Sequence, residues 1–217
     1  MARCCGSEYA CGADRQFSDE RAARDLESYR TKGPGVTTRL LRDGLTAAGP
    51  LSGSLLDIGA GIGALTFELL ARGVSQAVHV DASSAYIASA SQEAENRGVA
   101  KAIRFVQVDF LEVAPELPPA TIVTLDRVIC CYPAYQRLLA EALRHTERYL
   151  ALSYPRDVWY VHAGNALENA GCRMRRRPFR TFVHLVSQIE RIIAEAGFTR
   201  AVRNQTATWR ADVYAKS

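Results

Sequence analysis

Three closely spaced glycines follow a short apolar segment, in the run Leu55-Leu56-Asp57-Ile58-Gly59-Ala60-Gly61-Ile62-Gly63. Glycines at this spacing let the backbone turn sharply and approach a ligand closely. A helix is expected to start at the turn, and its first N–H groups would have no partner within the helix. Asp81 ends the next apolar segment, 22 residues after Gly59, where a carboxylate can accept both hydroxyls of a ribose. The spacing therefore predicts a site for a nucleoside-containing cofactor.

Two classes of cofactor fit this turn. Gly59, Gly61 and Ala64 satisfy the pattern G-x-G-x-x-G/A of dinucleotide sites. Asp57 stands two residues before the first glycine, where it would repel a pyrophosphate and attract an ammonium group. In addition, helical segments precede the first strand, and no length remains for a separate substrate domain. We therefore favour a cofactor that carries an ammonium group, with a nicotinamide-dependent oxidoreductase as the alternative.

The elements around the turn alternate between strands and helices. Strands are predicted at 54–58, 77–81, 103–108, 121–127 and 149–154, and helices at 62–72, 83–97, 133–146 and 181–196. This alternation predicts an α/β fold with a Rossmann-like, doubly wound and mostly parallel sheet. Two helices, at 18–32 and 36–47, precede the first strand as a cap. Residues 198–216 are expected to form two strands with a turn near Asn204-Gln205, which would give the sheet an antiparallel C-terminal strand.

Bulk properties agree with one globular domain of 217 residues, 48% hydrophobic and 23% charged, with a net charge of +4. We expect residues 1–50 to form a tail and cap helices, and residues 51–217 to form the cofactor-binding domain. The chain shows neither a signal peptide nor the run of about 20 apolar residues that a membrane span needs. A cytoplasmic protein is therefore expected, and its six cysteines should be free thiols.

The pattern Asp57-x-Gly59-x-Gly61-x-Gly63 with Asp81 resembles the class I S-adenosylmethionine-dependent methyltransferases. That family has seven strands, the last antiparallel, and the likeness covers residues 54–216. The resemblance implies that the turn, including Ala60, passes under the methionine and ribose parts of S-adenosylmethionine. It also implies that Asp57 lies near the amino group and that Asp81 binds the ribose hydroxyls.

Five further cofactor contacts come from the resemblance. Ala82 would lie against the adenine, Asp109 would accept from the adenine amino group, and Phe110 would pack nearby. Asp126 and Arg127 would lie beside the methionine part and the reacting methyl group.

Three more segments narrow the resemblance, namely Leu125-Asp126-Arg127-Val128-Ile129-Cys130-Cys131-Tyr132-Pro133, Ser153-Tyr154-Pro155-Arg156 and the closing stretch from Trp209 to Tyr214. They are similar to small bacterial methyltransferases loosely labelled magnesium-protoporphyrin O-methyltransferase-like. A porphyrin substrate does not follow from this label. We expect a small-molecule methyl acceptor and in-line methyl transfer, in which alignment and exclusion of water do most of the work.

Candidate catalytic residues follow the fourth and fifth strands: Tyr132, Tyr154 and Arg156, together with His162. His162 belongs to a long insertion at 157–180, where a substrate lid is expected. His184 is a second histidine that could serve as a base. Tyr29 and Arg30 in the cap could close over the cofactor.

Other functions remain open from the sequence. Arg173–Arg180 carries five arginines in eight residues and would suit an RNA-directed methyltransferase, although we do not expect nucleic acid as a partner. A non-catalytic protein that keeps the cofactor pocket is a further alternative. Cys4, Cys5 and Cys11 could bind a soft metal with Cys130 or Cys131, or a thiophilic metalloid, but an incidental role is favoured and no metal is expected. Thiol reactivity at Cys130-Cys131 is worth testing, and a homodimer is left open.

Overall fold

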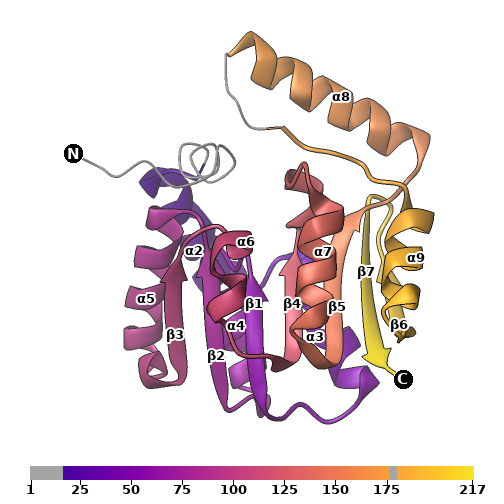
Figure 1. Cartoon of the computed structure of the whole chain (residues 1–217). Coiled ribbons are helices and arrows are strands. Elements are labelled where there is room, and N and C mark those ends of the chain that lie inside the picture. The colour runs from indigo at the N-terminus through magenta and orange to yellow at the C-terminus, as the bar shows by residue number, and fades with distance from the viewer. Residues whose placement is uncertain (1–16, 176–179) are drawn as a thin grey trace.

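One seven-stranded sheet organises the chain in the computed structural model, which describes residues 17–175 and 180–217. The strand order is β3-β2-β1-β4-β5-β7-β6 (Figure 1). The strands are β1 Ser54–Ile58, β2 Gln76–Asp81, β3 Ile103–Gln107, β4 Ala120–Asp126, β5 Thr146–Pro155, β6 Phe198–Gln205 and β7 Trp209–Lys216. β1 to β5 pair in parallel, whereas β7 runs antiparallel to both β5 and β6. The predicted doubly wound, mostly parallel sheet with an antiparallel C-terminal strand is confirmed.

Helices cover both faces of this sheet. The first face carries α2 Asp19–Lys32, α3 Val36–Ala48, α4 Ala64–Leu70 and α5 Ser84–Asn96, and the second carries α6 Phe110–Val113, α7 Tyr135–Arg144 and α9 Val186–Glu195. Short 3-10 turns stand at η1 Ala100–Ala102, η2 Ala114–Glu116 and η3 Ile129–Cys131. One further helix, α8 Trp159–Met174, lies beyond the end of the sheet (Figure 1).

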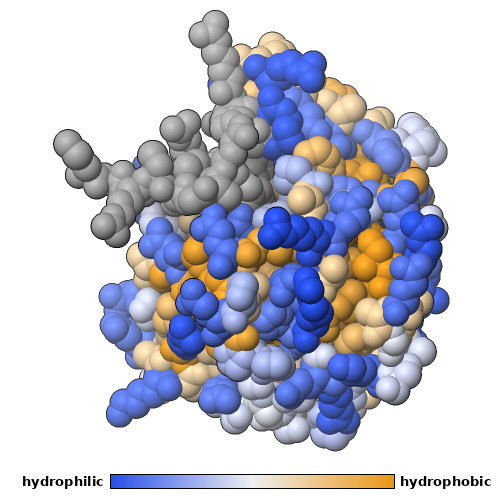
Figure 2. All heavy atoms as spheres, viewed as in Figure 1, coloured by the Kyte–Doolittle hydropathy of each residue, from blue (hydrophilic) through white to orange (hydrophobic). Residues whose placement is uncertain are grey.

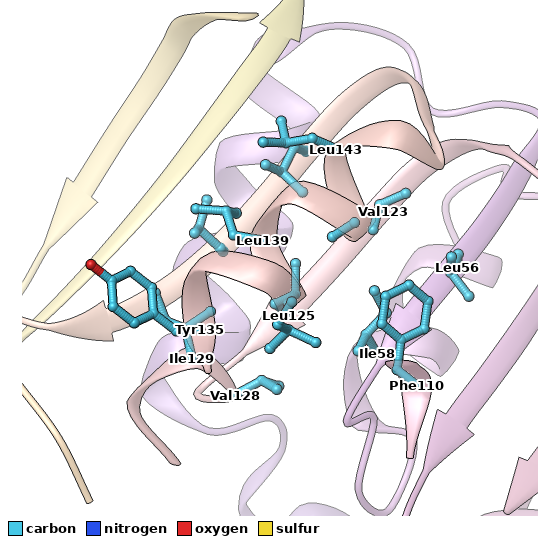
Figure 3. Close-up of a cluster of buried hydrophobic side chains, with 14 of the residues drawn as sticks. Leu56, Ile58, Phe110, Val123, Leu125, Val128, Ile129, Tyr135, Leu139 and Leu143 are labelled. Carbon is cyan, nitrogen blue, oxygen red and sulfur yellow. The ribbon is translucent and has the colours of Figure 1, made fainter. Parts of the chain in front are cut away.

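The two cores follow from alternation along each strand. Successive side chains of a strand point to opposite faces, so Leu55 joins the core under α3 and α4 while Leu56 joins the core under α6 and α7. On the second face, Leu139 and Leu143 of α7 pack in one cluster with β4, and Phe110 of α6 lies beside Ile58 (Figure 3). Burial of both faces makes this a three-layer domain, as expected for a parallel sheet.

Helix α3, predicted as part of a cap, packs into the hydrophobic core of the sheet. Leu41 and Leu45 are fully buried and pack with Ile122 and Val213 of the sheet. Helix α2 lies farther out and packs mainly on α5. The sequence-based division at residue 50 therefore crosses a continuous hydrophobic core.

Within the insertion at 157–180, where no helix was predicted, Trp159–Met174 form helix α8. None of the residues of this described helix is buried. Gly164 and Gly171 lie within it, and glycine weakens a helix by about 1 kcal/mol relative to alanine. With no core-facing apolar stripe and two glycines, the segment lacks the usual sequence signals of a helix.

The helix predicted at 181–196 begins later, at Val186. Residues 181–185 run beside the loop after β4: the Phe182 N–H donates to the Cys130 carbonyl oxygen at 2.6 Å, and His184 Nε2 lies 2.9 Å from the Ile129 carbonyl oxygen. These long-range hydrogen bonds replace those of a first helical turn. The hairpin turn falls at 206–208 rather than near Asn204-Gln205.

Hydrophilic and apolar residues are interspersed on the face of the molecule seen in Figure 2. Within the described residues, no helix is long and apolar enough to cross a membrane.

Tyr154, a candidate catalytic residue, lies inside the core at 1% exposure. Its hydroxyl donates to the carboxylate of Asp212, which is fully buried on β7 and also accepts two hydrogen bonds from Arg203. Burial, together with the Asp212 charge, raises the pKa of the Tyr154 phenol well above its ordinary value. Because a buried carboxylate is costly unless it is paired and hydrogen-bonded, this placement makes Tyr154 a support for the sheet.

We expect Tyr154→Phe to lower the free energy of unfolding by about 1.5–3 kcal/mol, the usual range for a hydrogen bond to a charged group. Urea unfolding would measure the change. Tyr160→Phe is the matched control: its hydroxyl donates to a carbonyl oxygen at the surface, so its effect should stay within about 0.5 kcal/mol. Equal effects of the two substitutions would contradict the assignment.

Candidate cofactor and acceptor site

A cavity of about 470 Å³ opens at the carboxyl ends of the parallel strands. It lies where the strand order reverses between β1 and β4, the usual ligand position in open α/β sheets. Its walls come from the turn after β1, the ends of β2 and β4, the segments after β3 and β4, and the cap segments of α2 and α3. The structure thus brings together the residues that the sequence assigned to a cofactor.

The glycine turn after β1 has three glycines with positive φ: 62° at Gly59, 57° at Gly61 and 82° at Gly63. A Cβ atom at Gly59 would lie 2.6 Å from Val128 Cγ2, so packing against the loop after β4 requires glycine there. A Cβ at Gly61 would meet only Tyr86, at 4.0 Å. Both Gly61 and Tyr86 line the cavity. The protein leaves open space at Gly61, which a ligand can use for close approach to the backbone.

Asp57 is buried at the end of β1 with 1% exposure. Its carboxylate accepts from the hydroxyls of Thr66 on α4 and Thr124 on β4, each at 2.7 Å. Burial raises the pKa of Asp57 to about 7, against the effect of the two hydroxyls, and the charges of Asp126 and Asp81 raise it further. This carboxyl can therefore gain or lose a proton near neutral pH.

Asp81 ends β2 and binds the glycine turn. Its two oxygens accept from the backbone N–H groups of Gly61 and Ser83, each at 2.8 Å. Ser83 caps α5, so the same carboxylate links the glycine turn to a helix start. Ala82, between them, also lines the cavity.

Asp109 and Phe110 begin the segment after β3. Asp109 caps α6 through the Leu111 N–H and accepts from the Tyr132 hydroxyl, with both carboxylate oxygens 2.9 Å from it. Phe110 is buried and lies beside Ile58 (Figure 3). Burial and the Asp109 charge raise the pKa of Tyr132 well above its ordinary value. The phenol therefore stays protonated and serves as a donor, not as a base.

Asp126 and Arg127 end β4 in a strained turn. Asp126 accepts from the hydroxyls of Thr38 and Ser153, each at 2.6 Å. Arg127 has φ of 60°, the only positive value among the described residues other than glycine. Its N–H donates to Ser153 Oγ at 2.8 Å. Strained backbone of this kind tends to stand at functional sites, and both residues line the cavity.

Three catalytic candidates lie outside this wall. Tyr154, Arg156 and His162 are not among the described residues that line the cavity. Arg156 donates to the carbonyl oxygens of Thr206 and Ala207 in the β6–β7 turn. His162 is half exposed on α8 and pairs with Asp157 at 2.7 Å.

Other residues of the site carried no clear sequence signal. His79 lies under the glycine turn, fully buried, with Nε2 3.1 Å from the Gly61 carbonyl oxygen. Burial lowers its pKa to about 4, so the neutral ring supports the turn. The Tyr86 hydroxyl of α5 donates to Asp25 of the cap helix α2 at 2.7 Å, and both residues line the cavity. Tyr29 also lines the cavity, whereas Arg30 pairs with Glu93.

Some expectations fall outside the described residues. Cys4, Cys5 and Cys11 precede residue 17, and two of the five arginines of the run, Arg176 and Arg177, lie at 176–179. Arg173 and Arg175 are exposed at the end of α8. Within the described parts of the chain, no group of three or more His, Cys, Asp or Glu side chains is placed to hold a metal ion.

The raised pKa of Asp57 predicts a pH-dependent stability. The group contributes stability at acidic pH, and this contribution is lost as pH rises from about 4 through about 7. His79, whose pKa is lowered by burial, makes the protein more stable as pH rises, which is opposite to the effect of Asp57. The contribution of Asp57 is therefore isolated by comparing wild type with Asp57→Asn. As pH rises through this window, the free energy of unfolding of Asp57→Asn minus that of wild type should increase by up to about 1.4 kcal/mol per pH unit. A difference between the two proteins that does not change with pH would contradict the burial effect.

Comparison with known proteins agrees with this geometry. Residues 55–149 match the family model of a methyltransferase domain. No curated protein sequence matches the chain.

Two solved structures share the fold. Magnesium protoporphyrin IX methyltransferase from Synechocystis PCC 6803, with bound S-adenosylhomocysteine, is 20% identical, with a TM-score of 0.73 over 94% of this chain and 98% of that chain. An O-methyltransferase family 2 protein from Planctomyces limnophilus, in complex with apigenin, is 18% identical, with a TM-score of 0.68 over 96% of this chain and 65% of that chain. The chain therefore shares the fold of these methyltransferases, and its residues 55–149, which contain the glycine turn and Asp81, are similar to a methyltransferase domain.

Proposed function

We propose that the chain transfers the methyl group of S-adenosylmethionine to a small-molecule acceptor by in-line displacement. The observation that carries this proposal is the cavity of about 470 Å³ between the strand ends and the cap helices. Its volume falls within the range of small-molecule sites, about 300–1,000 Å³. A walled cavity also serves to exclude water from the reacting groups.

The chain's residues fit this cofactor. We assign the ribose hydroxyls to Asp81 and the amino group to the region of Asp57, whose carboxylate form attracts a cation. The remaining wall of the cofactor site would consist of Gly59, Ala60, Gly61, Gly63, Ala82, Asp109, Phe110, Asp126 and Arg127. Open space at Gly61 supports a cofactor lying against the turn. The cofactor itself supplies an activated methyl group on a positively charged sulfur.

On the acceptor side we propose an acidic oxygen nucleophile. Arg127 and Arg21 line the cavity and would favour a carboxylate or phenolate. A carboxylate acceptor needs no general base, and the protonated Tyr132 would help to position it. One structural relative was solved with apigenin, and another is named for a protoporphyrin. Both molecules are planar and carry phenol or carboxyl groups, which supports an acceptor of this kind. Tyr154, Arg156 and His162 do not line the cavity and would act only through the scaffold.

The nicotinamide and RNA alternatives are weaker. The carboxylate of Asp57 disfavours a dinucleotide, and none of the described arginines of the run, Arg173, Arg175 and Arg180, lines the cavity. Cytoplasmic location and a homodimer stay predictions.

Calorimetric titration with S-adenosylhomocysteine, with NADH and NADPH run alongside, tests the proposal. We expect binding of the first ligand only, followed by release of S-adenosylhomocysteine when carboxylic and phenolic acceptors are screened with S-adenosylmethionine. Asp81→Asn should weaken binding by about 1.5–3 kcal/mol, while Asp43→Asn on the exposed side of α3 should not change it. Binding of a nicotinamide cofactor, or unchanged affinity in folded Asp81→Asn, would refute the assignment.

A valine at Gly61 should block the cofactor. Gly197→Val is the matched control, since Gly197 also has positive φ, 83°, and a Cβ atom added there would have no neighbour within 4 Å. Both substitutions should cost about 1–3 kcal/mol of stability through backbone strain. Only Gly61→Val should lose S-adenosylhomocysteine binding, measured on folded protein below its melting temperature. Equal retention in both variants would show that the ligand does not approach Gly61.

A further inference from the structure

Two adjacent thiols stand on the wall of the cavity. Cys130 and Cys131 belong to the turn η3 after β4, and both line the cavity. Their sulfur atoms lie 3.5 Å apart. The neighbouring wall residues are Arg127 and Tyr132, on the side that we assign to the methyl acceptor. Neither thiol has a role in the function proposed above.

A disulfide does not suit this pair. Consecutive Cα atoms are about 3.8 Å apart across a trans peptide bond, whereas disulfides usually join Cα atoms about 4.4–6.8 Å apart. The described peptide bonds include no cis bond. The pair is therefore built to stay as two thiols unless the backbone rearranges.

The two sulfurs share one environment. Both lie within hydrogen-bonding distance of the Arg127 carbonyl oxygen, Cys130 at 3.3 Å and Cys131 at 3.7 Å. The hydrogen bond from Cys130 lowers the pKa of Cys131, against the effect of burial, and the Arg127 charge lowers it further. The same hydrogen bond and burial raise the pKa of Cys130. The pair therefore loses its first proton from Cys131, which gives one thiolate, the form that bonds soft atoms.

We propose that Cys130 and Cys131 form a chelating dithiol that binds one trivalent arsenic centre through both sulfurs. An atom about 2.3 Å from each sulfur, the length of a zinc–thiolate bond, would make an S–atom–S angle of roughly 100°. A single soft centre can thus bridge the pair with little movement, whereas a direct S–S bond cannot form without it.

The number of ligands favours a trivalent metalloid over zinc. A structural zinc site needs four protein ligands, and no third metal-binding side chain joins the pair among the described residues. An arsenical of the type R–As(OH)₂ brings its own third substituent and needs two thiols. Two As–S bonds form and two As–O bonds break, while the two thiol protons leave with the hydroxides as two water molecules. No oxidant or reductant is required.

This binding does not depend on methyl transfer. A failure of S-adenosylhomocysteine binding would refute the proposed function and leave the dithiol site intact, and the reverse also holds. The two ligands can be titrated separately.

Phenylarsine oxide is the probe. Cys4→Ser, Cys5→Ser and Cys11→Ser are combined in the full chain so that binding reports on the remaining thiols. We expect one arsenical per chain by native mass spectrometry, located on the tryptic peptide 128–137, which contains Cys130 and Cys131 as its only cysteines. An excess of a small dithiol should remove it.

Single cysteine substitutions, added to the protein with the three serine replacements, test which thiols bind the arsenical. Cys131→Ser keeps a hydroxyl that can donate to the Arg127 carbonyl oxygen, yet it should weaken binding by roughly 100-fold, because the second bond to arsenic is an intramolecular event. Cys130→Ser should do the same, and Cys172→Ser should leave binding unchanged. Melting temperature verifies the fold, and if Cys130→Ser does not fold, Cys131→Ser decides alone.

Three results would overturn the proposal. They are undiminished binding in Cys131→Ser, an adduct that maps to Cys172, and a lack of arsenical binding in a background protein that still folds.

Discussion

The placement of carboxylates at the carboxyl ends of four parallel strands, three of them buried and that of Asp126 half-buried, is the constraint on which the rest of the site depends. Asp57, Asp81, Asp109 and Asp126 end or follow β1, β2, β3 and β4. A buried carboxylate is costly unless donors surround it. The chain supplies hydroxyls and backbone N–H groups from α3, α4, α5 and the loop after β4. Each carboxylate thereby fastens a loop or helix to the sheet, and together they define the edge of the cavity.

The loop after β4 depends on the same arrangement. Asp126 holds Ser153, and Ser153 in turn accepts the N–H of the strained Arg127. The Arg127 carbonyl oxygen then faces both thiols of η3. Residues 181–185 add backbone contacts to η3 from the other side, through Phe182 and His184. The acceptor wall is therefore assembled from segments far apart in sequence, which explains how a conformation with positive φ at an arginine can persist.

The difference between local signals and contacts of segments far apart in the chain explains which features could be predicted from the sequence. The strands, the glycine turn and the acidic strand ends were predicted because their signals are local: apolar runs, glycine spacing and position after a strand. The partners Thr38, Thr124 and Ser153 were missed because a hydroxyl carries no local signal of the carboxylate it will meet. His79 was missed because it stands within a strand, and only the parallel register places it under Gly61.

The failure to predict helix α8 has a similar physical cause, because its contacts also carry no local sequence signal. Helix α8 has no buried residue, and Trp159, Leu167 and Met174 are 80%, 75% and 85% exposed. Its inner side instead carries Asn165 and Asn169, which bond Thr181. Since amphipathic patterns assume an apolar inner face, a helix held by polar contacts does not follow the rule.

Tyr154 was assigned to catalysis from its place after a strand, and only the pairing of β5 with β7 shows that it meets Asp212.

Access to the cavity follows from how the two cap helices are attached. Helix α3 is anchored by fully buried leucines, Leu41 and Leu45, so displacing it would open the core of the sheet. Helix α2 buries Ala22, Leu26 and Tyr29, and its other contacts are polar ones, such as Tyr86 with Asp25 and Arg30 with Glu93. Water can replace these part-buried hydrogen bonds when α2 leaves, so their net contribution to stability is modest. Displacing α2 therefore costs less than displacing α3, and because α2 lines the cavity, a ligand that contacts it would stabilise the closed form in proportion to its binding free energy.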